Sequence, residues 1–129
     1  MNIVVRNYHL DGYGHVNHAR YLEFLEEARW QFLERLGLPA QLGDIMLVVV
    51  RLDIRYRRSA KAGETLNIAC RIKSLSARHW VMGQSITLAG SGEQAVEAEI
   101  SLMPVCAASG KSTRFPESLL TVLRHSIAE

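Results

Sequence analysis

Hydrophobic residues recur at steps of three and four positions along residues 18–36, and they alternate with polar residues along several later segments. The three-and-four spacing is typical of a helix with one apolar face. Gly37 suits a left-handed C-cap, and Pro39 cannot continue a helix. We therefore predict a helix from about His18 to Leu36. The face that the rest of the protein must cover comprises Tyr21, Leu22, Phe24, Leu25, Ala28, Phe32 and Leu36.

A period of two predicts strands on both sides of this helix. A short β-prone stretch covers residues 2–10, and four strands are expected after the helix. In the first of these four, one face is apolar and the other is charged. The glycine- and serine-bearing connections suit antiparallel neighbours. The four strands are expected from Ile45 to about Arg57, from about Leu66 to Lys73, from about Arg78 to Leu88 and from about Gln94 to Val105.

The order of these elements predicts an α+β fold. A short helix from Pro116 to about Ile127 follows the last strand, and no linker or repeat interrupts the chain. Strands that cluster after a helix favour a single domain over residues 1–129, in which a five-stranded antiparallel sheet curls around the long central helix. Trp30 lies among glutamates on the polar helix face, so a loop of its own subunit or a second subunit is expected to cover it.

Composition narrows the class of protein. The 129 residues are 48% hydrophobic and 22% charged, which is typical of one globular domain. No apolar run approaches the roughly 18 residues of a membrane span, so we expect no membrane partner. The N-terminus lacks a signal-type segment and two cysteines are too few for a disulfide framework, which favours a cytoplasmic protein.

Basic residues gather between Arg51 and Lys61, although the formal net charge is only +2. Such a cluster can contact the phosphates of nucleic acid or of a nucleotide-bearing substrate, and it can also be a solvated strand end. Because Tyr56 is the only aromatic residue interleaved with this cluster, we expect no nucleic-acid partner.

Residues 9–18 carry the candidate chemistry, and three interpretations compete. Glycines for a turn and Asn17 as a helix cap would make the segment purely structural. Imidazoles and a carboxylate suit a metal, but their spacing matches no familiar ligand pattern, and we expect neither a metal nor another cofactor. The four side chains concerned are His9, Asp11, His15 and His18.

The third interpretation is acyl transfer to water. Such a reaction needs a group that attacks the carbonyl carbon or activates water, and Asp11 can supply it. It also needs donors for the developing oxyanion, and the backbone amides of His18 and Ala19 stand at the positive end of the helix dipole. Losing one such donor typically costs on the order of 3 kcal/mol in the activation barrier.

A family resemblance favours the third interpretation. The run Asp11-x-x-Gly14-His15-Val16-Asn17-x-x-x-Tyr21-Leu22-x-Phe24-x-Glu26, followed by Tyr56-Arg57-Arg58-Ser59-Ala60 and Gly63-Glu64, resembles the hotdog-fold acyl-CoA thioesterases of the 4-hydroxybenzoyl-CoA thioesterase type. The resemblance spans nearly the whole chain and is sharpest over residues 8–30 and 45–64. It implies a hotdog fold and the hydrolysis of acyl-CoA to free acid and CoA.

The resemblance also implies roles for individual residues. Asp11 would be the catalytic carboxylate, acting as general base or as nucleophile, and the amide near His18 would be the oxyanion donor. His15 and Asn17 stand where the aromatic thioesterases carry apolar or aromatic residues, which implies a medium- to long-chain acyl substrate and supporting roles for both. The residues implied to bind substrate are Gly14, Tyr21, Arg57, Arg58 and Lys61.

The family is oligomeric, so the resemblance further implies a homodimer or homotetramer with active sites at the dimer interface. Two alternatives stay open at this point. In the first, the acyl group is carried on acyl carrier protein instead of CoA, and in the second, the chain binds acyl-CoA without turning it over. Hotdog dehydratases fit less well, because no separate histidine faces an acidic residue of the central helix in the expected arrangement.

Overall fold

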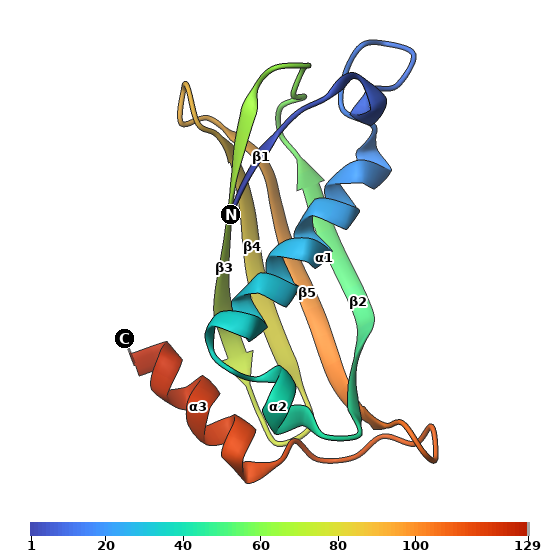
Figure 1. Cartoon of the computed structure of the whole chain (residues 1–129), viewed down its shortest axis with the longest axis vertical. Helices are drawn as coiled ribbons and strands as arrows, with labels where there is room; N and C mark the ends of the chain where they lie inside the picture. The colour runs from blue at the N-terminus through green and yellow to red at the C-terminus, as the bar shows by residue number, and fades with distance from the viewer. Residues whose placement is uncertain (129) are drawn as a thin grey trace. The chain divides into compact units, whose positions relative to one another are not determined.

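The computed structural model describes residues 1–128, which form a five-stranded antiparallel sheet, three α-helices and one short 3-10 helix (Figure 1). This element order confirms the predicted α+β class. The elements are β1 (Asn2–Val4), η1 (Asn7–His9), α1 (His18–Arg35), α2 (Pro39–Leu42), β2 (Ile45–Tyr56), β3 (Thr65–Leu75), β4 (Trp80–Leu88), β5 (Gln94–Cys106) and α3 (Glu117–Ala128).

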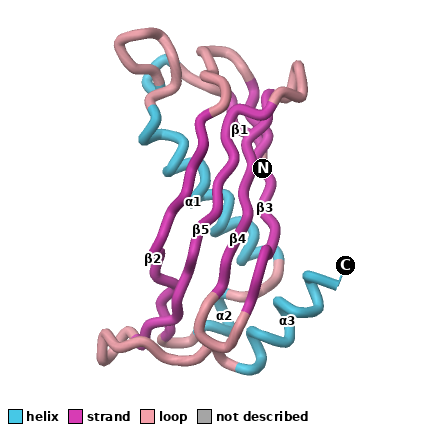
Figure 2. Tube along the Cα trace, turned by 180° about the vertical axis from the view of Figure 1, so that it is seen from behind, coloured by secondary structure: helices cyan, strands magenta, loops and turns pink. Residues whose placement is uncertain are grey.

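The strands are arranged in the order β1-β3-β4-β5-β2, so β1 and β2 are the two edges of the sheet (Figure 2). β1 pairs with β3 in antiparallel register, with Asn2 opposite Asn67 and Val4 opposite Thr65. The four strands after the long helix thus form the body of the sheet, and the first of them, β2, is left with one free edge.

Two local predictions need correction. The β-prone stretch over residues 2–10 is a strand only as far as Val4, because Asn7–His9 turn into a 3-10 helix. There the buried His9 ring accepts a hydrogen bond at Nδ1 from the Arg6 N–H, 2.9 Å away. The second correction is α2: Pro39 was expected only to end the preceding helix, whereas it occupies the first turn of this short helix.

The end of α1 agrees with its prediction to one residue. Gly37 has φ +68°, and its N–H donates to the Glu34 carbonyl while the Leu38 N–H donates to the Leu33 carbonyl. This pair of bonds is a Schellman motif, which satisfies carbonyls that the helix end leaves free. Within the described residues, no helix combines the length and the apolar character needed to cross a membrane.

The described residues pack into two compact units, and the first contains residues Met1–Gln31, Ile54–Cys70 and Gln84–Ala98. Its core includes Leu25 of α1, which is fully buried. The buried Gln84 side chain of β4 donates to the Leu25 carbonyl at 2.9 Å and accepts from Arg29 at 3.0 Å. Helix and sheet are therefore joined in this unit by polar contacts as well as by apolar packing.

The second unit, formed by the remaining described residues, is built around Trp80. The Trp80 ring is fully buried and contacts the rings of Phe32 and Phe115, each with centroids 6.5 Å apart. Three leucines of α3 are also buried, namely Leu119, Leu120 and Leu123. The apolar face of the short C-terminal helix is thus covered within its own unit.

The face of β2 that was expected to be dry is exposed over much of its length. Val50 is 51% exposed, Leu52 38% and Tyr56 46%. Side-chain burial does not alternate along β2, where residues 49–53 are all exposed, and as an edge strand β2 has a neighbouring strand on one side only. A long edge strand with exposed apolar side chains is a template for pairing with another chain.

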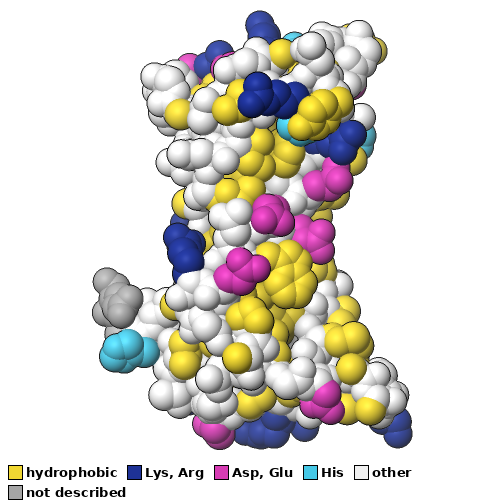
Figure 3. Space-filling model, viewed as in Figure 1, with side chains coloured by type: hydrophobic (Ala, Val, Ile, Leu, Met, Phe, Trp, Pro, Cys, Tyr) yellow, Lys and Arg dark blue, Asp and Glu magenta, His cyan; other side chains and the backbone are white. Residues whose placement is uncertain are grey.

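Trp30 is the other large exposed hydrophobic residue of functional interest. It is 49% exposed on α1, with Glu23, Glu26 and Glu27 exposed on the same helix. The surface in Figure 3 shows hydrophobic side chains next to acidic ones in this region. No loop within residues 1–128 hides Trp30, so the prediction of a subunit contact stays a prediction.

Candidate active site

A tight turn presents Asp11. Its Oδ1 accepts hydrogen bonds from the backbone N–H groups of Tyr13 at 2.8 Å and His15 at 3.3 Å, and its own N–H donates to the His15 carbonyl at 2.8 Å. Gly14 has φ +76°, a conformation that favours glycine. Among the described residues Asp11 Oδ2 receives no hydrogen bond, so one carboxylate oxygen holds the turn and the other is free to react.

Asn17 caps α1, as the sequence indicated. Its Oδ1 accepts the Ala19 N–H at 3.0 Å, and its own N–H donates to the His9 carbonyl at 2.9 Å. The Ala19 amide, expected as an oxyanion donor, is therefore already engaged in this structure. The His18 N–H has no acceptor within the described part of the chain, which leaves it as the better placed of the two expected donors.

A cavity of about 270 Å³ brings these groups together in the first unit. Six of the predicted site residues line it, whereas Gly14, Asn17, Ala19 and Lys61 do not. Gly14 and Asn17 shape the turn and the helix start instead. The lining residues are Asp11, His15, Val16, His18, Tyr21, Tyr56, Arg57, Arg58 and Ser59.

Tyr21 is a buried support of this cavity. It is 3% exposed, and its hydroxyl oxygen accepts the Ala60 N–H at 3.1 Å. Burial raises the pKa of Tyr21 above the ordinary value, despite the lowering effect of that hydrogen bond. The phenol is therefore protonated at neutral pH, and its main observed role is to hold the segment after β2 in place.

Tyr56 also lines the cavity, although no role was predicted for it from the sequence. Its hydroxyl donates to the His18 carbonyl at 3.1 Å, and its ring lies 5.7 Å from that of Tyr21 between centroids. The signal that identifies it is the two-residue period of β2, which places Tyr56 on the same face as Ile54 at the end of the strand.

The predicted phosphate-binding arginines already have carboxylate partners. Arg57 pairs with Glu97 and Arg58 with Glu93, each at 2.5 Å between nitrogen and oxygen. The hydrogen bond that Arg58 donates to Glu93 raises the pKa of Arg58, but both pairs are nearly half exposed, where an ion pair adds little stability. Lys61 has no ion-pair partner among the described residues, although its backbone N–H donates to Glu64.

The four possible metal ligands differ in burial and in location. His9 is 8% exposed and lies against the Phe24 ring, whereas Asp11, His15 and His18 line the cavity. Residues 1–128 contain no group of three or more His, Cys, Asp or Glu side chains placed to hold a metal ion.

His9 is expected to make the free energy of unfolding depend on pH. Burial lowers its pKa below 6.5, with a further contribution from Arg20, so the folded state favours neutral imidazole. The unfolded state takes up the proton more readily, and the stabilisation is lost as the pH falls below about 6.5. We expect the free energy of unfolding, measured by urea denaturation, to fall between pH 7.5 and 5.5.

His9→Asn keeps a hydrogen-bond acceptor near the Nδ1 position but does not titrate, so it should flatten this pH dependence. The exposed His125 on α3 is the matched control, and His125→Asn should leave the slope unchanged. An equal slope in wild type and His9→Asn would contradict the role of His9.

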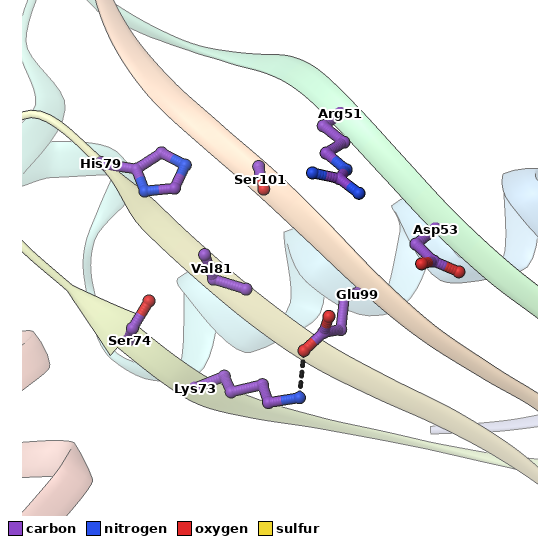
Figure 4. Close-up of a pocket in the computed structure, with 8 residues that line it drawn as sticks. All are labelled: Arg51, Asp53, Lys73, Ser74, His79, Val81, Glu99 and Ser101. Carbon is purple, nitrogen blue, oxygen red and sulfur yellow. Dashed lines mark hydrogen bonds and ion pairs between the residues drawn. The ribbon is translucent and has the colours of Figure 1, made fainter.

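A second cavity, of about 480 Å³, lies across strands β2 to β5 in the second unit (Figure 4). Lys73 and Glu99 form an ion pair across it, and this pair lowers the pKa of Glu99. Arg51 and Asp53 face the same cavity from β2. It lacks the combination of a half-free carboxylate and a helix N-terminus, so the smaller cavity is the better candidate for catalysis.

Comparisons with known proteins identify the family of this chain. Residues 5–123 match the model of the thioesterase-like superfamily. The chain belongs to the thioesterase-like superfamily. It is 43% identical over 103 residues to the long-chain acyl-CoA thioesterase FadM of Escherichia coli K12, which covers 78% of each chain.

Two solved structures extend the comparison. The probable thioesterase YbaW of Escherichia coli aligns with a TM-score of 0.88 and 36% identity, covering 98% of this chain and 97% of the other. A thioesterase of Thermus thermophilus, complexed with coenzyme A and Zn, aligns with a TM-score of 0.84 and 26% identity, covering 100% and 94%. The prediction that this thioesterase has a hotdog fold is confirmed.

Proposed function

We propose that this thioesterase hydrolyses medium- to long-chain acyl-CoA to the free acid and CoA. The observation that carries the proposal is one cavity that holds both a carboxylate with a free oxygen and an unsatisfied amide at a helix start, Asp11 and His18. The 43% identity to a protein named long-chain acyl-CoA thioesterase supports the substrate class. Coenzyme A bound to the Thermus structure supports the carrier.

The two groups divide the chemistry between them. As general base, Asp11 Oδ2 takes a proton from the water that attacks the thioester carbonyl carbon; as nucleophile, it attacks that carbon itself and forms an acyl-enzyme anhydride that water then hydrolyses. In both routes the C–S bond breaks, and the CoA thiolate leaves and takes up a proton that originates from the water. Oδ1 keeps the carboxylate oriented through Tyr13 and His15. The His18 N–H, at the positive end of the α1 dipole, donates to the oxyanion that forms at the carbonyl oxygen. His15 lines the cavity in a supporting role.

The basic residues at the cavity edge are proposed to contact the phosphates of CoA. Arginine binds phosphate through paired charge-assisted hydrogen bonds, and Arg57 and Arg58 line the cavity with exposed guanidinium groups. Phosphate would replace Glu97 and Glu93 as their partners at little cost, because both ion pairs are exposed. Lys61, three residues after Arg58, offers a charge that is not engaged by another described side chain.

The protein is further proposed to act as a homodimer that pairs through β2, with dimers able to associate into tetramers. The β2 edge is free and 12 residues long, and Met46, Val49, Val50 and Leu52 are exposed along it. A second copy would satisfy the free backbone groups of this edge and bury its apolar side chains.

The test of the substrate is a hydrolysis screen over short, medium, long and aromatic acyl-CoAs. We expect the highest kcat/KM with medium to long chains. Paired assays with acyl-CoA and acyl carrier protein of equal chain length should favour CoA, and a preference for the protein carrier would assign the alternative substrate. Binding without turnover across the whole series would overturn the enzymatic proposal.

A further inference from the structure

The peptide unit between His18 and Ala19 is held at both ends. Its N–H donates to the Asn17 side chain at 3.0 Å, and its carbonyl accepts from the Tyr56 hydroxyl at 3.1 Å. A peptide unit is planar, so two bonds in opposite directions restrict its rotation. One partner comes from the turn before α1 and the other from the end of β2, which ties the helix start to the sheet.

The Tyr56 side chain is itself well supported. Its ring packs against Tyr21 and lies edge-on to the His18 imidazole, with centroids 6.4 Å apart. The next residue, Arg57, is tied to β5 through its N–H, which donates to the Ala95 carbonyl at 2.8 Å. Burial raises the pKa of Tyr56, so its hydroxyl keeps the proton that it donates.

We propose that Tyr56 is a positioning residue for hydrolysis, because its hydroxyl, together with Asn17, clamps the His18–Ala19 peptide and so aims the adjacent His18 N–H at the oxyanion. The two peptide units share the His18 Cα, so the orientation of one constrains the other. The inference rests on the proposed function of the cavity. Tyr56 acts through the backbone of His18 and does not contact the substrate.

The clamp acts mainly in the transition state. A thioester oxygen in the ground state is a weak acceptor, and the His18 N–H gains most when negative charge develops on that oxygen. A misaligned donor therefore lowers kcat more than it raises KM. Contact between Tyr56 and bound substrate would instead raise KM.

Tyr56→Phe removes only the hydroxyl. We expect kcat for the preferred acyl-CoA to fall about three- to tenfold with KM within twofold of wild type, as for the loss of one neutral hydrogen bond. Tyr8→Phe is the matched control, because Tyr8 is 70% exposed and its hydroxyl makes no hydrogen bond among the described residues. Unchanged kcat in Tyr56→Phe, or a loss carried by KM alone, would overturn the proposal.

A readout independent of activity tests the clamp itself. Hydrogen exchange of the Ala19 amide, followed by NMR, should be faster in Tyr56→Phe and in Asn17→Ala than in wild type. In the double variant, kcat should fall by less than the product of the two single fold-losses, because both substitutions release the same peptide unit. Unchanged exchange in Tyr56→Phe would overturn the clamp, whereas an inactive wild type would overturn the proposed function instead.

Discussion

Asp11→Asn is expected to lower kcat for acyl-CoA hydrolysis by about 10²- to 10⁴-fold. Asparagine keeps an Oδ1 that accepts the Tyr13 and His15 amides, so the turn should persist. It replaces the free Oδ2 with an amide that neither accepts a proton nor attacks a thioester. Steady-state kinetics with the preferred acyl-CoA measures the loss, and thermal unfolding checks that the fold is retained.

The matched control for this variant is Asp44→Asn. Asp44 is exposed and lies directly before β2, outside the cavity residues. Its kcat and KM should equal those of wild type. Wild-type turnover in Asp11→Asn would remove Asp11 from the mechanism, and because the substitution preserves the turn, loss of structure would not explain a slow variant with a normal unfolding curve.

Val50→Lys is expected to convert the dimer into a monomer. Full burial of a valine side chain stabilises an interface by about 1.5–3 kcal/mol, and in a two-fold symmetric dimer both copies lose this contribution. An edge lysine also opposes pairing because its charge has to be desolvated. Light scattering should give a mass near twice 14.5 kDa for wild type and near 14.5 kDa for the variant.

Ile127→Lys serves as the control for this prediction, because Ile127 is 50% exposed on α3 and lies outside β2. It should leave the dimer intact. The Val50→Lys monomer should also lose most thioesterase activity if the second copy completes the active site. A monomeric wild type would contradict the dimer, and a dimeric Val50→Lys would move the interface away from this edge.

The helix and strands of this protein follow from local patterns. The three-and-four spacing of α1, Gly37 after its end and the period of two in the later segments each depend on residues close in sequence. The structure reproduces the helix, its end and the strands β2 to β5, although side-chain burial in β2 does not alternate. The prediction of a β-prone stretch over residues 2–10 was wrong in part. The backbone turns after Val4, where the Arg6 N–H donates to His9, and local propensity does not reveal this contact.

The turn and the helix cap of the candidate site could also be predicted from local sequence, whereas its long-range partners could not. Asp11, Gly14 and Asn17 lie within seven residues, so the turn and the cap follow from their side-chain chemistry. Phosphate contact and a solvated strand end were both expected for the cluster that includes Arg57 and Arg58. The specific partners Glu97 and Glu93 could not be predicted, because they lie 40 and 35 positions away and only sheet pairing brings them close.

The sequence by itself determined the elements, the turn that presents Asp11 and the cap at the start of α1, because these depend on backbone preferences and on contacts over a few residues. The tertiary structure alone decided that β2 is an edge of the sheet and that Tyr56 reaches the His18 carbonyl. The last contact joins residues 38 positions apart, and its geometry depends on how the chain packs between them.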